Sequence, residues 1–149
     1  MNIYLIGIKG TGMSALACLL ADLGHHVRGS DVSRYIFTQE KLKEKGIICD
    51  SLEDSKYDQY PYVVLGNTFW KQSLVEQLKK EKKTIFTYQE MIRYLANQYP
   101  SIAICGTHGK TTTAHLIETM LGANHICSYI IGDGEGKGEK DADYFIFEA

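Results

Sequence analysis

Short apolar runs alternate with amphipathic segments along the first two thirds of the chain. The apolar runs predict strands, and the segments with apolar positions at helical spacing predict helices. Predicted strands cover residues 3–6, 26–28, 47–48, 63–65 and 84–86, and predicted helices cover residues 13–23, 38–45, 73–80 and 89–97. This repeated βα order predicts an α/β fold, in which a doubly wound parallel sheet carries helices on both faces.

A second βα series is predicted after Pro100, which disfavours helix at the residue before it and marks a domain boundary. Its predicted elements are a buried strand over residues 102–105, a helix from 110 to 121, and strands over residues 126–131 and 144–147. The intervening stretch "GDGEGKGEKDAD" predicts a mobile, glycine-rich loop. Because the chain stops directly after the apolar "YFIFEA", we expect it to be a fragment of a longer protein.

The stretch "GTHGKTTT" lies between the predicted strand and helix of this second series. The usual phosphate-loop spacing fails here, because Ile104 stands where its first glycine belongs. Gly106 and Gly109 still allow the backbone to curl, so that N–H groups at the start of the helix converge on one anion. The alternative is an ordinary turn with Lys110 in solvent, but the flanking strand and helix favour a phosphate loop, which His108 could help to form.

A second glycine loop, "GIKGTG", follows the first predicted strand. Gly7, Gly10 and Gly12 lie at the start of the helix, but Lys9 replaces the middle glycine of a dinucleotide-binding fingerprint. This substitution weakens a nicotinamide interpretation. The loop can still receive a diphosphate at the helix N-terminus, and Lys9 could add positive charge.

Two polar residues follow other strands at the same predicted sheet edge. Asp31 comes after the second strand, where an acidic side chain can accept hydrogen bonds from a ribose, although it could equally cap a following helix. Asn67, in "GNT" after the strand at 63–65, would line the same edge or belong to a plain polar loop.

Composition narrows the classes of function. The chain has 149 residues, 44% of them hydrophobic, and a formal charge of −2, which favours neither a nucleic-acid nor a membrane surface. No secretory leader is present, so we expect a cytoplasmic protein. The four cysteines are scattered singly and predict reduced packing residues, and the five histidines show neither metal-ligand spacing nor a catalytic pairing.

The ordered motifs resemble a known family. "GIKGTGMSALA", "VRGSD", "GTHGKTTT", "IGDGEGKG" and "DYFIFEA" are together similar to the Mur ligases of peptidoglycan synthesis, within them to the UDP-N-acetylmuramate:L-alanine ligases. The resemblance spans the whole chain. It implies a Rossmann-like UDP-sugar-binding domain over residues 1–99 and, over residues 100–149, the truncated start of a P-loop-type central ATPase domain.

The resemblance also implies a reaction. A Mur ligase of this kind uses ATP and Mg²⁺ to phosphorylate the carboxylate of UDP-N-acetylmuramate, and the amine of L-alanine then attacks the acyl phosphate. Such chemistry requires positioned anions and neutralised charge. A chain that holds only the UDP-sugar domain and part of the ATP site would be inactive alone.

Site residues are implied by the same resemblance. Lys110 would contact the β- and γ-phosphates, while Thr111 and Glu148 would ligate Mg²⁺, Glu148 near the acyl phosphate. The remaining ATP-binding positions would be Gly106, Thr107, His108, Gly109 and Thr112. The UDP-sugar would contact Gly7, Lys9, Gly10, Thr11, Gly12, Met13, Asp31 and Asn67.

Two other functions stay open at this stage. One is a muropeptide-recycling Mur ligase, which attaches a whole peptide; its first loop differs from "GTGMSALA". The other is a non-catalytic dinucleotide-binding module, against which the lysine at the middle glycine position and the second phosphate loop both count. The amino acid that is attached cannot be derived from these residues.

Overall fold

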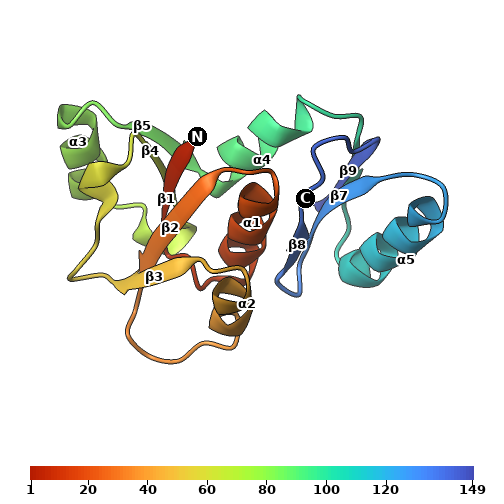
Figure 1. Cartoon of the computed structure of the whole chain (residues 1–149), viewed down its shortest axis with the longest axis horizontal. Coiled ribbons are helices and arrows are strands. Elements are labelled where there is room, and N and C mark those ends of the chain that lie inside the picture. Colours follow the sequence, from red (N-terminus) through yellow and green to blue (C-terminus); the bar gives the residue numbers. More distant parts are fainter.

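The first sheet of the protein is fully parallel. A computed structural model describes residues 1–149 (Figure 1). Its first five strands have the order β3-β2-β1-β4-β5. They are β1 (Asn2–Ile6), β2 (His26–Asp31), β3 (Ile48–Ser51), β4 (Tyr62–Leu65) and β5 (Thr84–Thr87). Because the chain winds outward from β1 in both directions, the predicted doubly wound sheet is confirmed.

Helices cover both faces of this sheet. They are α1 (Thr11–Asp22), α2 (Gln39–Glu44), α3 (Gln72–Lys80) and α4 (Tyr88–Ala96), with short 3₁₀ turns at Tyr57–Gln59 and Asn67–Phe69. Side chains alternate along β1: Ile3 and Leu5 pack with α1, α2 and α4, whereas Tyr4 and Ile6 pack with α3 and Tyr60. This alternation places one apolar layer on each face of the sheet.

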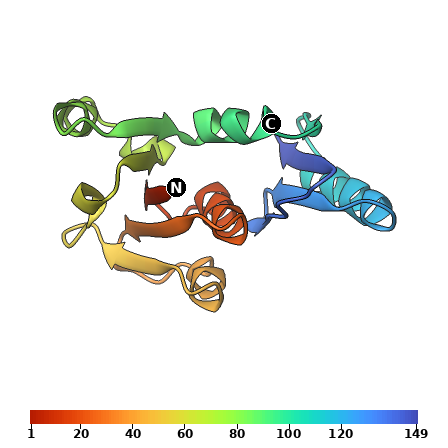
Figure 2. The same ribbon diagram turned by 45° about the horizontal axis from the view of Figure 1, so that its top comes forward.

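The second sheet has the strand order β6-β9-β7-β8. It contains β6 (Ser101–Ile104), β7 (Cys127–Ile131), β8 (Glu135–Lys137) and β9 (Tyr144–Glu148), and only β8 runs antiparallel to its neighbour. The helix α5 (Lys110–Gly122) covers one face through Ala114, Ile117 and Leu121, as predicted. On the other face, Ile130 and Phe145 join the core around α1. Figure 2 shows α1 between the two sheets.

The prediction of a mobile loop after β7 is wrong, because the segment contains β8 and packs on α1. A β-carbon at Gly136 would overlap the carbonyl oxygen of Ala15, and one at Gly138 would overlap that of Leu19. The N–H of Gly138 also donates to Asp22 Oδ2 at 3.2 Å. Glycine therefore serves here for close approach between a strand and a helix, not for mobility.

The four cysteines differ in burial. All four cysteines are free, and Cys18 and Cys127 are buried as predicted. Cys105 is exposed and lies beyond the end of β6, which contradicts its prediction as a buried strand residue. β6 is an edge strand in which Ile104 is buried and Ala103 is exposed. No helix is long and apolar enough to cross a membrane.

Candidate functional site

The first glycine loop turns tightly between β1 and α1. Gly7 has φ +85°, and a β-carbon there would lie 2.6 Å from the ring of Phe69, so only glycine fits. The first helical hydrogen bond runs from the N–H of Ser14 to the carbonyl of Gly10 at 2.8 Å. The helix has no side-chain cap. The N–H groups that precede Ser14 therefore lack intrahelical acceptors, which suits an anion.

Lys9 does not present its charge to this turn. Its side chain is buried, and Nζ donates to the carbonyl oxygens of Val32 at 2.8 Å and Arg34 at 3.0 Å. The expectation that Lys9 adds charge directly to a diphosphate is therefore not met in this conformation. Lys9 instead holds the segment that follows β2.

Asp31 ends β2 and is only 4% exposed. Its Oδ2 accepts from the backbone N–H of Lys9, and its Oδ1 accepts from that of Val32, both at 2.7 Å. The alternative reading of Asp31 as a helix cap is wrong, because the next helix has Thr38 as its N-cap residue. Asp31 joins the glycine loop to the end of β2.

Five of the predicted UDP-sugar residues line a single cleft of about 260 Å³. They are Gly7, Gly10, Met13, Asp31 and Asn67. The cleft lies at the carboxyl ends of β1, β2 and β4, where the strand order reverses direction. Ligands of doubly wound sheets bind at this kind of position. Three other predicted residues, Lys9, Thr11 and Gly12, do not line the cleft.

The second glycine loop precedes α5. Gly109 is its N-cap residue and has the left-handed φ of 75°, and the N–H of Thr113 donates to its carbonyl at 2.9 Å. The N–H groups of residues 110–112 thus have no intrahelical acceptors. Lys110 Nζ donates to the carbonyl of Gly106 at 2.9 Å, so the lysine folds back over the loop.

The other loop residues are accessible. Thr107, His108 and Thr112 are exposed, and Thr111 is half-buried in the first turn of α5. The Nδ1 atom of His108 lies 3.3 Å from Thr107 Oγ1. An exposed turn of backbone N–H groups with a lysine beside it fits a chain of phosphates.

Glu148 lies next to this loop. In the pairing of β6 with β9, Glu148 is opposite Ile104, the last residue of β6. Its Oε1 accepts from the N–H of Gly132 at 2.7 Å, and a β-carbon at Gly132 would lie 2.7 Å from its Oε2. The carboxylate is thus fixed at the sheet edge from which the loop emerges. A threonine hydroxyl and a carboxylate supply oxygen ligands, which suit Mg²⁺.

Tyr88 lies between the first glycine loop and the end of β9, and was not anticipated from the sequence. A β-carbon at Gly12 would lie 3.2 Å from its ring, and Tyr88 lines a cavity of about 430 Å³ together with Glu148. Burial, followed by the charge of Glu148, raises the pKa of Tyr88 to about 12. The capping box of Thr87 and Glu90 sets the start of α4 at Tyr88 and is visible in the sequence as T-x-x-E. Nothing in the sequence indicates its neighbours.

A doubly wound α/β sheet with a cleft at its switch point, followed by a second glycine loop at a helix start, is an arrangement typical of nucleotide-binding proteins. A sequence model described as "Mur ligase family, catalytic domain" matches residues 2–100. The chain belongs to the Mur ligase family, and the resemblance seen in its motifs is confirmed.

Individual relatives support this assignment. The chain is 42% identical to a UDP-N-acetylmuramate--L-alanine ligase of Lactobacillus delbrueckii subsp. bulgaricus, over 99% of this chain and 34% of the relative. It is 43% identical to the ligase of the same description from Lacticaseibacillus casei, over 98% of this chain and 34% of that relative. The chain therefore spans about a third of the length of these relatives.

Solved structures confirm the fold. A murein peptide ligase from Neisseria meningitides, described as UDP-N-acetylmuramate:L-alanyl-gamma-D-glutamyl-meso-diaminopimelate ligase, matches 99% of this chain and 52% of its own. The TM-score is 0.81 at 23% identity. UDP-N-acetylmuramate-alanine ligase MurC from Thermotoga maritima also gives a TM-score of 0.81, at 21% identity, over 99% of this chain and 36% of its own.

Proposed function

We propose that this chain is the part of a UDP-N-acetylmuramate:L-alanine ligase that binds the nucleotide sugar and contributes to the ATP site. The observation that carries this proposal is the 42% identity, over 99% of the chain, to a relative described as that ligase. In this proposal residues 1–99 form the UDP-sugar-binding domain and residues 100–149 open the ATP-binding domain. The proposal includes a cytoplasmic location, as expected from the sequence.

The cleft beside the first glycine loop is assigned to UDP-N-acetylmuramate. Uncapped N–H groups at the start of α1 would receive the diphosphate, and Asn67, which is exposed on the cleft wall, would supply a polar contact. Asp31 Oδ1 and Oδ2 already accept backbone N–H groups, but each carboxylate oxygen has further capacity to accept from a ribose hydroxyl. Thr11 and Gly12 extend the same first turn of the helix.

The second glycine loop is assigned to ATP. Residues 106–109 would surround the phosphates, Lys110 would release the Gly106 carbonyl to contact them, and Thr112 would add a hydroxyl at the helix start. Thr111 and Glu148 would hold Mg²⁺. When bound, ATP supplies the phosphoryl group that makes the substrate carboxylate reactive toward the amine of L-alanine.

The muropeptide-recycling ligase is the second candidate, because a structure of that kind has the same TM-score as the alanine ligase. Both structural matches are too distant in sequence to decide between them. The alanine ligase is favoured by the much higher identity of the curated relatives. Because the chain belongs to the Mur ligase family, a non-catalytic dinucleotide-binding module is not the favoured function.

Two variants of this chain separate the sites. Asn67→Ala is expected to weaken UDP-N-acetylmuramate binding about 10-fold, the loss of one polar contact, and to leave ADP binding unchanged. Lys110→Ala is expected to weaken ADP binding and to leave UDP-N-acetylmuramate binding unchanged. Isothermal titration calorimetry of both ligands measures this, and equal losses in both variants would contradict the assignment of two separate sites.

For the ligation itself, Lys110→Ala is placed in a full-length protein that contains this chain. Phosphate release that depends on L-alanine is expected to disappear, whereas UDP-N-acetylmuramate binding stays nearly intact. Unchanged turnover would remove Lys110 from the proposed role.

A further inference from the structure

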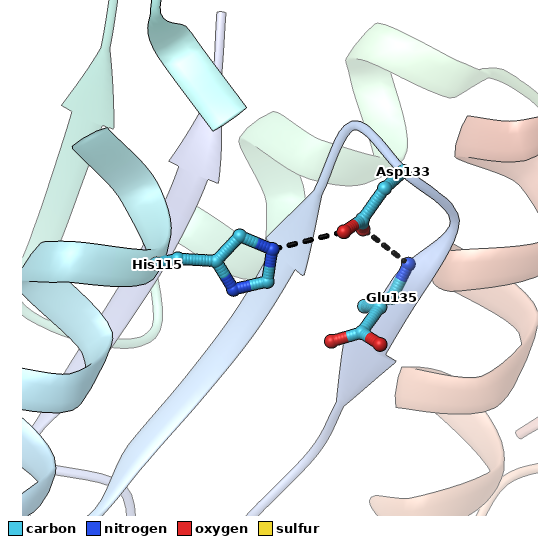
Figure 3. Close-up of side chains that lie close together, drawn as sticks. All are labelled: His115, Asp133 and Glu135. Atoms are coloured by element: carbon cyan, nitrogen blue, oxygen red, sulfur yellow. Dashed lines mark hydrogen bonds and ion pairs between the residues drawn. The ribbon is translucent and has the colours of Figure 1, made fainter. Parts of the chain in front are cut away.

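A histidine and two carboxylates that have no role in the sites assigned above converge beside the second sheet. Figure 3 shows His115 of α5, Asp133 of the turn after β7, and Glu135 at the start of β8 pointing toward one another. One possible ligand atom from each residue lies within 4.8 Å of the other two. His115 comes from a different element than Asp133 and Glu135, which share one hairpin, so the meeting of the three is a product of the fold.

The geometry of this cluster is held by hydrogen bonds. His115 Nε2 lies 2.9 Å from Asp133 Oδ2, and the N–H of Glu135 donates to Asp133 Oδ1 at 3.1 Å (Figure 3). These two hydrogen bonds fix the rotamer of Asp133, with Oδ2 toward the imidazole.

We propose that His115, Asp133 and Glu135 form a binding site for a divalent transition-metal ion of the Zn²⁺ class. Mg²⁺ and Ca²⁺ prefer sets made only of oxygen ligands, whereas one imidazole and two carboxylates suit Zn²⁺ and its neighbours. His115 and Glu135 are half-buried and Asp133 is exposed, so solvent can complete the coordination. His115 lies one turn of α5 after Thr111, and Asp133 follows Gly132, whose N–H donates to Glu148. The three residues therefore neighbour the proposed Mg²⁺ position but include none of its ligands.

Lys41 is the local competitor for this site. Its Nζ lies 3.2 Å from Glu135 Oε1, and the two side chains are 40% and 43% exposed. An ion pair this exposed contributes little to stability, so a metal ion can displace it. Removal of the lysine should strengthen metal binding, because it removes a positive charge and frees a carboxylate oxygen.

Metal binding here would have a structural consequence. His115 belongs to the helix that begins at Lys110, while Asp133 and Glu135 belong to the hairpin whose strand β8 packs on α1. A bound ion would connect these elements directly. It would stabilise the folded chain in proportion to its affinity and concentration.

The test titrates the full chain with ZnCl₂ by calorimetry and follows thermal unfolding. We expect saturable binding of one ion, at least about a 10-fold loss of affinity in His115→Ala, and a gain of affinity in Lys41→Gln. His125→Ala is the matched control, because His125 lies 3.5 Å from Asp143 at similar exposure but has no third ligand. Circular dichroism checks that each variant is folded.

Paramagnetic broadening with Co²⁺ locates the ion independently, and we expect the amide signals of residues 115, 133 and 135 to broaden first. The proposal is overturned if His115→Ala binds Zn²⁺ as tightly as the original chain. It is also overturned if broadening is strongest near His25, whose Nδ1 lies 3.0 Å from the N-terminal amine. Neither result would alter the assignment of the two nucleotide sites.

Discussion

Gly136 of β8 lies directly against Ala15 of α1, where a β-carbon would overlap the alanine carbonyl oxygen. The contact fastens the second sheet to the helix that carries the first glycine loop. We predict that Gly136→Ala lowers the melting temperature by roughly 4–10 °C, because overpacking against backbone costs about 1–3 kcal/mol. Thermal unfolding by circular dichroism measures this shift.

The control for this variant is Gly122→Ala at the end of α5. The nearest atom to a β-carbon there is Glu118 Oε1 at 3.7 Å, so the methyl group fits. We expect unchanged or slightly higher stability, by up to about 1 kcal/mol, because alanine favours a helix over glycine. If both variants melt at the original temperature, β8 is not held on α1 as described.

The ion pair of Arg28 with Asp50 predicts a dependence of stability on pH. Arg28 Nε and Nη2 donate to the two carboxylate oxygens at 2.8 and 2.7 Å, and Tyr4 donates to Oδ2 at 3.0 Å. The hydrogen bond from Arg28, opposed by burial and helped by Tyr4, lowers the pKa of Asp50 below 3.8. The ion pair therefore contributes fully to the free energy of unfolding above the pKa that Asp50 has in the unfolded chain. This contribution is lost as pH falls through the lower pKa of the folded chain.

Urea unfolding at pH 6 and at pH 3 measures this effect. Asp50→Asn should lose about 1–3 kcal/mol at pH 6 and less at pH 3, because pH 3 lies below the unfolded pKa of 3.8 and the contribution of the ion pair decreases as pH falls below that value. Asp141→Asn is the control, since Asp141 is exposed and makes no ion pair. An equal loss at both pH values would show that the ion pair is not the cause.

Tyr88 offers a test of the contact between the two candidate sites. Burial is the main reason that its pKa is raised from 10.0 to about 12, and the charge of Glu148 is the second. Glu148→Gln should lower the pKa of Tyr88 but leave it above 10.0. Titration of the tyrosine Cζ carbons by NMR measures it, with Glu118→Gln as the control. An unchanged pKa would place Glu148 too far from Tyr88 to join the sites.

The same shift predicts the stability of the chain in alkali. Because the folded pKa of Tyr88 is raised, its contribution is present below the unfolded value of 10.0 and is lost as pH rises through about 12. Tyr88→Phe should therefore flatten the fall in the free energy of unfolding over that interval. An equally steep fall in Tyr88→Phe would assign the loss to other tyrosines.

The βα order and the glycine loops could be predicted from the sequence because they depend on local patterns. Apolar periodicity located β1, β2, β4 and β5, whereas the strand predicted at 47–48 shares only Ile48 with β3. Gly7, Gly10 and Asn67 follow strands, and Asp31 ends one, at the carboxyl ends that face the cleft. In parallel sheets these ends share one edge, so the residues meet without any further information.

The features that could not be predicted depend on contacts between distant segments. "GDGEGKGEK" has the composition of a loop, and only its position against α1 makes Gly136 and Gly138 part of a packed strand. The charge of Lys9 suggested a ligand contact, but its Nζ donates to the carbonyl oxygens of Val32 and Arg34. His115 has no metal-ligand spacing in the sequence, because its partners lie on the hairpin that packs beside α5.

We propose above that the cleft at the carboxyl ends of β1, β2 and β4 binds a uridine-diphosphate sugar. The most direct measurement titrates the chain with UDP-N-acetylmuramate and, separately, with NAD, while amide shifts are recorded by NMR. We predict saturable binding of UDP-N-acetylmuramate, with the largest shifts at Gly7, Gly10, Met13 and Asn67, and no binding of NAD. Saturable binding of NAD without binding of the uridine ligand would contradict the account.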